Sequence, residues 1–180
     1  MEKAKSIFRE IIWYVIVFVV TFVVCKYFIL VSTVMSGSME PTIMTGDTAF
    51  CNRLAYINDI PQRGDKVVFL FDETGEYLFK RVIGLPGEVV SFADNRVLIN
   101  GEPIEEDYLP AVTITECDKT FTVPDGCVFM MGDNRCNSYD SRYWQYPYVK
   151  IDNIMGRCFG SINFSFEFNI KRPIKEFFEK

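Results

Sequence analysis

The sequence predicts a mostly β protein carried on a single N-terminal transmembrane helix. Residues 11–30 form a run of 20 residues in which only Lys26 is charged. Short runs of β-branched and aromatic residues, separated by turn signals, follow it. The 17 Phe, 9 Tyr and 2 Trp residues favour a β-rich fold, because these side chains fit half-buried sheet surfaces. We expect one compact β domain, residues 31–180, behind one anchor.

The apolar run has the length of a membrane-spanning helix. Twenty residues at about 1.5 Å each span about 30 Å, the thickness of a hydrocarbon core. Lys26 lies near one end, where its long side chain can reach the interface. Lys3, Lys5 and Arg9 precede the run, so residues 1–10 are expected in the cytoplasm. The chain is therefore predicted to cross the cell membrane once, with its β domain on the extracytoplasmic side.

Two other interpretations of this run fit the sequence less well. A cleaved signal peptide needs small residues at its cleavage site, and Val23, Val24, Lys26 and Tyr27 are not small. No convincing lipobox precedes Cys25. A buried core helix is the other alternative, but the apolar character of this run does not depend on the helix face.

Three β-hairpins are expected after the anchor, because pairs of apolar runs flank short polar turns. The pairs are KVVFLF with YLFKRVI (66–71 and 77–83), EVVSF with RVLING (88–92 and 96–101) and KTFTV with CVFMMG (119–123 and 127–132). The C-terminal sequence IKRPIKEFFEK, residues 170–180, is charged and contains a proline. We expect a surface segment there.

The charge and the absence of histidine exclude several classes of function. The formal net charge is −5, and residues 31–180 carry 15 Lys and Arg against 22 Asp and Glu, a net charge of −7. No nucleic-acid partner is therefore expected. Without histidine the chain forms neither a Ser-His-Asp triad nor an HExxH zinc site.

The six cysteines do not indicate a metal site. None of them form a CxxC pair, so we expect no metal and no cofactor. Cys25 lies in the apolar run, and the other five cannot all pair with one another because their number is odd. We expect small buried hydrophobic side chains. The alternative is a Cys117–Cys127 disulfide, if this part of the chain faces an oxidising space.

The candidate nucleophile is Ser38, in the sequence VMSGSMEPTI (34–43) shortly after the apolar run. A serine hydroxyl needs a base to become a nucleophile. Without histidine, that base must be a carboxylate or a neutral lysine. A lysine is neutral near physiological pH only if desolvation or a nearby cation lowers its pKa.

Lys80 is the lysine that best fits this requirement. In a strand, Leu78 and Val82 point to the same face as Lys80, so its amine would stand among aliphatic side chains. Lys66 is the alternative, but the adjacent Asp65 favours its charged form. Taken singly, Ser38 is typical of a turn serine and Lys80 of an edge-strand lysine. The combination points to catalysis.

Four sequence blocks together are similar to a known family. SGSMEPT, GDTAF, KRVIGLPGE and MGDNRCNSYDSR occur in this order after an N-terminal anchor. With these blocks the chain resembles the bacterial type I signal peptidases, membrane-bound Ser-Lys proteases that remove signal peptides from secreted proteins. The likeness runs from the anchor to about Arg157. It implies a compact signal-peptidase-like (LexA-like) β fold. The short spacing from Lys80 to Ser138 implies little of the inserted second domain of some relatives.

The resemblance implies a role for each residue that matches a family motif. Ser38 matches the nucleophile and Lys80 the general base. Ser36 matches the serine whose hydroxyl joins the Ser38 N–H in an oxyanion hole. Ser138 matches the serine that hydrogen-bonds the lysine ammonium and orients it.

Other residues of the last block match supporting positions. Asp140 and Arg142 match a structural ion pair, and residues 133–135 match turn scaffolding at the start of the block. Two positions depart from the family pattern, because many relatives have aspartate where Cys136 and Glu88 stand. Neither position is catalytic in the family, so we expect local turn effects only.

The resemblance also implies the substrate and the partners. The family cuts after small residues, often alanine, at the first and third positions before the bond. This implies two shallow apolar pockets. The residues that flank the dyad in sequence, and could line the pockets or be plain core, are Val34, Met39, Leu78 and Phe79. The implied partners are signal peptides of secreted preproteins and the lipid bilayer, and we expect a monomer. The sequence YFILVSTVM (27–35) is expected to lie on the membrane surface; the alternative is that it simply continues the helix and enters the first strand.

Several other functions have weaker support. A LexA-like self-cleaving repressor would need a DNA-binding domain in place of the anchor. A β-lactamase or penicillin-binding enzyme would need the pattern S-x-x-K, and no serine here has lysine three residues later. An inactive membrane-anchored binding module would be expected to lack Ser38 or Lys80, and both are present. A specialised peptidase for a few surface or pilus proteins stays open.

Overall fold

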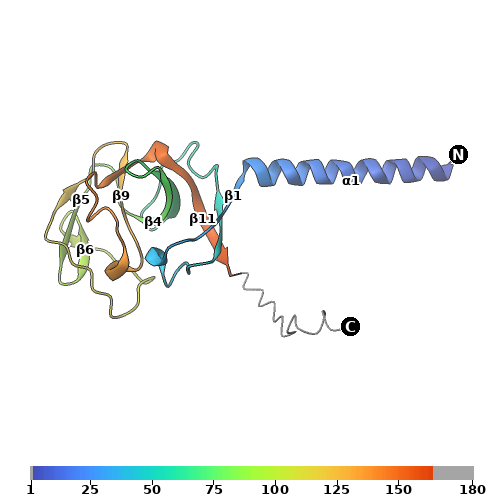
Figure 1. Ribbon diagram of the computed structural model, residues 1–180. Coiled ribbons are helices and arrows are strands. Elements are labelled where there is room, and N and C mark those ends of the chain that lie inside the picture. Colours follow the sequence, from blue (N-terminus) through green and yellow to red (C-terminus); the bar gives the residue numbers. More distant parts are fainter. Residues whose placement is uncertain (1, 164–180) are drawn as a thin grey trace, which may run out of the picture.

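The N-terminal helix stands apart from a β domain. The computed structural model describes residues 2–163, and of residues 2–5 only the backbone. Helix α1 (Glu2–Tyr27) extends away from the domain (Figure 1). It contains one span, Ser6–Tyr27, with a mean hydropathy of 2.3 and no part buried in the domain. By length and composition this helix is suited to crossing a membrane. The predicted surface segment 170–180 lies outside the described residues.

The helix ends three residues before the predicted end of the anchor. The Phe28 N–H still donates to the Val24 carbonyl at 3.0 Å, but the next residues belong to strand β1 (Ile29–Thr33). This strand pairs with β2 (Thr48–Asn52). Since the sequence stays apolar across the boundary, hydropathy alone could not locate the change from helix to strand.

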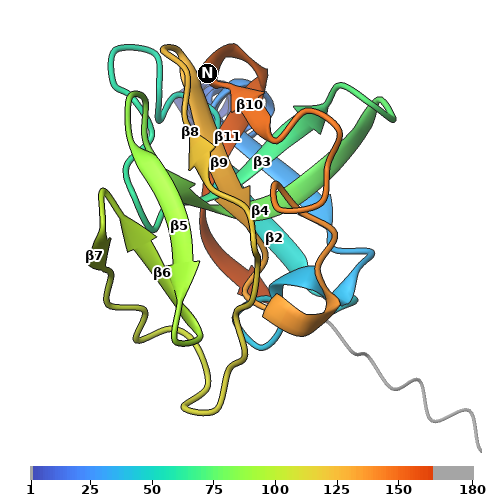
Figure 2. The ribbon, with the colours of Figure 1, turned by 90° about the vertical axis from the view of Figure 1, so that its left-hand side faces the viewer.

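The described residues of the domain form two antiparallel sheets. Its remaining strands are β3 (Lys66–Phe71), β4 (Glu76–Gly84), β5 (Val89–Ala93), β6 (Arg96–Ile99), β7 (Glu102–Pro103), β8 (Phe121–Thr122), β9 (Cys127–Met131), β10 (Tyr148–Lys150) and β11 (Ile154–Ile162). The larger sheet has the order β1-β2-β11-β3-β4-β9-β10 and the smaller one β7-β6-β5-β8. Figure 2 shows β5, β6 and β7 together on one side of the domain. The predicted mostly β fold behind one apolar helix is confirmed.

Two of the three predicted hairpins form. Strands β3 and β4 pair from Lys66↔Arg81 to Phe71↔Glu76, and β5 pairs with β6 through a turn in which Asp94 has a positive φ. The third predicted hairpin is wrong. Strand β8 pairs with β5 in the smaller sheet, whereas β9 pairs with β4 and β10 in the larger one. The turn between β8 and β9 therefore connects the two sheets.

Within the described part of the domain, the helical elements are three short 3-10 turns. They are η1 (Gly37–Met39), η2 (Arg135–Asn137) and η3 (Ile151–Asn153). The first two contact each other although about a hundred residues separate them (Figure 2). Both carry residues singled out in the sequence, so the fold brings the first and the last of the four blocks together.

The cysteines depart from the expectation of unpaired buried side chains. Cys51 on β2 and Cys158 on β11 are register partners and form a disulfide within a buried apolar cluster. Cys117 and Cys127 are both free, so the alternative pairing is wrong. The bonded pair is separated by 107 residues. Only the strand order, which the sequence did not reveal, makes these two neighbours.

Candidate active site

Ser38 lies in the 3-10 turn η1, between the first two strands. The next residue, Met39, is buried in a cluster with Val34 and Phe79, and this contact anchors the turn to the core. Ser38 itself is 8% exposed. The Ser36 hydroxyl oxygen lies 3.3 Å from the Ser38 hydroxyl oxygen, within hydrogen-bonding distance. The turn therefore presents two serine hydroxyls side by side.

Lys80 reaches the Ser38 hydroxyl from the middle of β4. Its Nζ donates a hydrogen bond to Ser38 Oγ at 2.6 Å, and the lysine is 3% exposed. Burial lowers the pKa of Lys80 from 10.5 to about 8, and nearby charges, with Asp140 first among them, modify this effect. A substantial fraction of the amine is thus neutral close to physiological pH. The structure brings together the two residues that the sequence selected.

The loop that follows β9 closes around Ser38. The Asn134 N–H donates to the Ser38 carbonyl at 3.0 Å, and its side-chain amide donates to the Gly37 carbonyl at 3.0 Å. Asp133 accepts two hydrogen bonds from Arg81, at 2.8 and 2.5 Å. Since Arg81 follows Lys80 directly, one loop holds the serine turn and the lysine strand. Asp133 and Asn134 were predicted only to shape a turn, but they also bind Arg81 and the serine turn.

Ser138 lies close to the dyad but does not make the predicted hydrogen bond to Lys80. Its hydroxyl is buried and has no hydrogen-bond partner among residues 2–163. Ser138 instead packs against Gly132. A Cβ added to this glycine would lie 2.2 Å from Ser138 Oγ and 2.3 Å from the Ser38 carbonyl oxygen. Ser38 and Ser138 therefore contact the same glycine.

Gly132→Ala is expected to displace the dyad. A methyl group so close to a backbone carbonyl cannot be accommodated, so the loop or the serine turn must move. A displacement of about 1 Å at a catalytic group costs on the order of 10²-fold in rate. We expect this loss in kcat, and a loss of about 1–3 kcal/mol in the free energy of unfolding. Gly126→Ala, at a position with open space but a positive φ, is the control for simple backbone strain. If it reduced kcat as strongly, the explanation by contact would fail.

Asp140 and Arg142 form the predicted ion pair. The Arg142 Nε lies 2.9 Å from Asp140 Oδ1, and both side chains are almost inaccessible to solvent. The second Asp140 oxygen accepts the Gly132 N–H at 3.0 Å. Arg142 Nη2 donates to the Arg135 carbonyl at 2.8 Å. The ion pair therefore holds the loop at two points, the Gly132 N–H and the Arg135 carbonyl.

The four predicted pocket residues do not lie together. Val34, Met39 and Phe79 belong to the cluster below η1, whereas Leu78 packs against a second cluster around Phe69. A cleft beside the serine turn has a volume of about 380 Å³. It is lined by Glu40, Pro41, Met44, Pro110, Val112, Thr113 and residues 133–136. None of the four predicted pocket residues lines this cleft.

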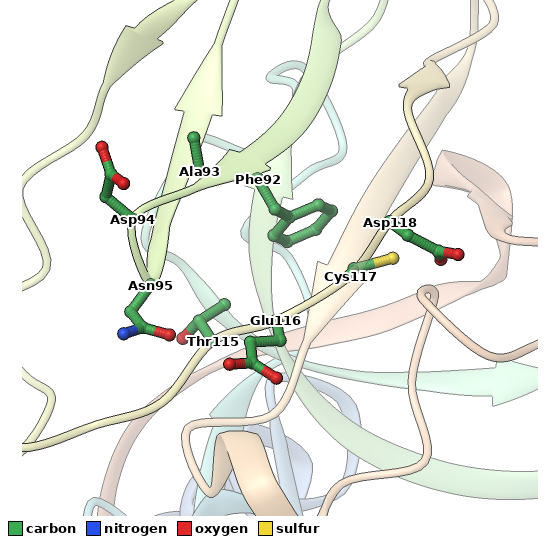
Figure 3. A pocket seen from close by; sticks show the side chains of 8 residues that line it. All are labelled: Phe92, Ala93, Asp94, Asn95, Thr115, Glu116, Cys117 and Asp118. Atoms are coloured by element: carbon green, nitrogen blue, oxygen red, sulfur yellow. The ribbon is translucent and has the colours of Figure 1, made fainter.

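A larger cavity lies away from the dyad. It has a volume of about 570 Å³ and is lined by residues 92–95, at the β5–β6 turn, and 115–118 (Figure 3). Neither Ser38 nor Lys80 contributes to it. Within residues 2–163 there is no group of three or more metal-ligating side chains.

A buried serine hydroxyl that accepts a hydrogen bond from a buried lysine of lowered pKa is the arrangement of a Ser-Lys hydrolase. The comparisons with known proteins agree. A family profile described as "Signal peptidase, peptidase S26" matches residues 7–162, and the chain belongs to this family.

Individual relatives of this chain are named signal peptidase I. A signal peptidase I of Leptolyngbya laminosa is 40% identical over 131 residues, which cover 68% of this chain and 63% of that protein. One of Bacillus caldolyticus is 34% identical over 159 residues, covering 81% and 85%. A solved structure of a signal peptidase I from Enterococcus faecalis V583 is 36% identical and covers 54% of this chain and 95% of that one, with a TM-score of 0.48. The chain thus spans less than two thirds of the length of the Leptolyngbya relative. Family membership and the apolar helix α1 together indicate a membrane-anchored protein.

Proposed function

We propose that this protein is a membrane-anchored serine endopeptidase that removes N-terminal signal peptides from exported preproteins, cutting after small residues in an Ala-X-Ala pattern. The observation that carries the proposal is the 2.6 Å hydrogen bond between Lys80 Nζ and Ser38 Oγ in a buried site. Membership of the signal peptidase family supports the choice of substrate.

The reaction is acyl transfer to the serine followed by hydrolysis. Neutral Lys80 removes the Ser38 proton as the hydroxyl oxygen attacks the scissile carbonyl. The resulting oxyanion accepts hydrogen bonds from the Ser36 hydroxyl and the Ser38 N–H, and one such donor is typically worth about 2.7–4 kcal/mol. When the C–N bond breaks, Lys80 gives its proton to the leaving amine. Lys80 then deprotonates the water that releases the signal peptide from Ser38.

The anchor serves the same reaction. A signal peptide is itself an apolar helix in the bilayer, so a tethered enzyme meets it at a raised effective concentration. The basic residues before the apolar run favour a cytoplasmic N-terminus, residues 1–10, with the β domain on the other side of the membrane. One chain supplies both members of the dyad and the loop that supports them, so the proposed reaction does not require a second copy.

The pH dependence of cleavage follows from the lowered pKa of Lys80. Only the neutral amine acts as base, so kcat/KM is expected to rise about tenfold per pH unit below pH 8 and to level off above it. A pH profile of kcat/KM from pH 5 to 10 checks this. A profile that is flat between pH 6 and pH 8 would exclude neutral Lys80 as the base.

The deciding experiment uses the purified full chain in detergent with added lipid. A preprotein with an Ala-X-Ala site is added, and the product masses are read, with Ser38→Ala in parallel. Cleavage after the second alanine, absent in Ser38→Ala, is the expected result. No cleavage by a folded wild-type protein would contradict the general peptidase, and would favour a specialised enzyme for a few surface proteins or an inactive relative. Cleavage that persisted in Ser38→Ala would show that another residue is the nucleophile.

A further inference from the structure

The loop that holds Ser38 is itself closed by one buried arginine. The Arg135 Nε donates to the Gly132 carbonyl at 3.1 Å, and its backbone N–H donates to the Asp133 carbonyl at 2.9 Å. Asn134, which holds the Ser38 carbonyl, lies between these contacts. The side chain of Arg135 is fully inaccessible to solvent. A buried guanidinium needs a counterion, because burial without a partner is costly.

Glu106 supplies that counterion from a different part of the chain. It lies in the segment that follows β7, and its two oxygens accept from Nη1 of Arg135, at 3.0 Å, and from Nη2. The Thr115 hydroxyl accepts a further bond from Nη1 at 3.0 Å. Among the described residues, Glu106 is the one carboxylate that forms an ion pair with Arg135. The loop around the nucleophile therefore depends on a residue about thirty positions earlier in the sequence.

Tyr108 connects the same glutamate to the lysine strand. Its hydroxyl donates to Glu106 Oε1 and accepts from Arg135 Nη2 at 3.3 Å. Its ring lies against Arg81, with the guanidinium carbon 3.6 Å from the ring centroid. Arg81 follows Lys80 and binds Asp133. One pair of side chains thus contacts both arginines that hold the dyad.

We propose that Glu106 is a positioning residue for the Ser38–Lys80 dyad and that Tyr108 acts with it. Glu106 keeps Arg135 on the Gly132 carbonyl, and this contact holds the loop that binds the Ser38 carbonyl. Tyr108 keeps Arg81 on Asp133 in the same loop. Together they fix the serine turn relative to the lysine strand. The kinetic part of this inference rests on the proposed function; the structural part does not.

The neighbouring residues supply matched controls. Glu105 and Asp107 flank Glu106, carry the same charge and are exposed. Neither forms a hydrogen bond or ion pair in this network. Glu105→Gln and Asp107→Asn each remove one negative charge from the same segment, as Glu106→Gln does. Both are expected to leave kcat, KM and the exchange of the active-site amides at their wild-type values.

The first test needs no substrate. Amide hydrogen exchange is measured on the full anchored chain in detergent with lipid, for the wild type, Glu106→Gln, Tyr108→Phe and the two controls. We expect at least tenfold faster exchange in residues 36–40 and 132–138 for Glu106→Gln, and a smaller increase for Tyr108→Phe. Wild-type exchange in these two segments for both variants would overturn the inference.

The second test measures kinetics on the same samples with the Ala-X-Ala preprotein. Glu106→Gln is expected to lower kcat by about 10–100-fold while KM changes less than about twofold, because the dyad is displaced and the substrate contacts are kept. Tyr108→Phe is expected to lower kcat by about 3–10-fold. The double variant Glu106→Gln/Arg135→Gln should be no slower than Arg135→Gln alone, because the two residues act as one unit. If the fold losses in kcat of the two single variants multiplied in the double variant, Glu106 and Arg135 would act independently, and the inference would be contradicted.

Failure of this inference and failure of the proposed function give different results. If the wild type does not cleave, the function is wrong and the exchange data alone decide the positioning role. If the wild type cleaves and both variants keep its kcat, the function stands and the inference is wrong. Should Glu106→Gln not fold, Tyr108→Phe decides. It lacks one hydroxyl group, and an unchanged kcat together with unchanged exchange would overturn the proposal.

Discussion

Lys80→Met is expected to abolish cleavage and, at the same pH, to stabilise the protein. The amine is the base of the proposed reaction, so its loss should lower kcat/KM by roughly 10³-fold or more. The stabilisation has a separate cause. Burial lowers the pKa of Lys80 from 10.5 to about 8, so the fold disfavours the charged amine. At about 1.4 kcal/mol per pKa unit, the charged form costs on the order of 3 kcal/mol. Methionine has a similar length and no charge.

The stabilisation should depend on pH in a defined direction. The folded pKa of Lys80 is lower than its unfolded value, so folding releases a proton between pH 8 and pH 10.5. Wild-type stability therefore rises with pH across this window. The advantage of Lys80→Met is expected to be about 3 kcal/mol at pH 7 and to disappear near pH 10.5. Denaturant unfolding of both proteins at several pH values measures it.

Lys66→Met is the matched control, with the same substitution on the neighbouring strand β3. Lys66 is half-buried and was the alternative candidate for the base. Its replacement is expected to keep cleavage and to change stability by less than about 0.5 kcal/mol. Loss of cleavage in Lys66→Met together with activity in Lys80→Met would mean that the wrong lysine has been assigned.

Asp140→Ala is expected to cause a large loss of stability. Asp140 and Arg142 are almost inaccessible to solvent and bonded through both carboxylate oxygens. Removing one partner leaves the guanidinium buried without a counterion, which typically costs about 3–5 kcal/mol. The Gly132 N–H also loses its acceptor. The free energy of unfolding measured in denaturant should fall by this amount.

The double variant Asp140→Ala/Arg142→Met tests whether the loss of stability comes from the unpaired arginine charge or from changed packing. Without the buried charge, it should recover most of the stability lost in the single variant. If it were as unstable as Asp140→Ala, the loss would come from packing and not from the unpaired arginine. Asp140→Asn gives a second readout, because Asp140 raises the pKa of Lys80. The acidic limb of its pH profile is expected to shift below pH 8.

The dyad could be predicted from sequence because its chemistry is restrictive. With no histidine present, a serine nucleophile leaves few candidate bases, and Lys80 has the aliphatic residues Leu78 and Val82 on either side of it along the strand. The two hairpins that form were predicted for a similar reason, since each is joined by a short turn with polar residues. Local signals of this kind need no knowledge of the rest of the fold.

Other features depend on which strands become neighbours, and the sequence does not encode this locally. The Cys51–Cys158 disulfide joins strands that are 107 residues apart. Glu106 stands among other acidic residues and has no sequence signal that sets it apart from Glu105. Ser138 lies beside the same glycine as Ser38, but its hydroxyl has no hydrogen-bond partner among the described residues. Each of these contacts joins segments that are far apart in the sequence.

The junction between α1 and β1 has a consequence for where this protein can cut. A single residue, Phe28, separates helix from strand, and its N–H and carbonyl are both hydrogen-bonded, to Val24 and to Arg53. This short connection limits how far the β domain can move relative to α1, which extends from it (Figure 1). If α1 spans the bilayer, we expect the serine and the lysine to stay at a nearly constant distance from the membrane surface. Preproteins whose Ala-X-Ala site is moved by several residues relative to their apolar segment should then be cleaved more slowly.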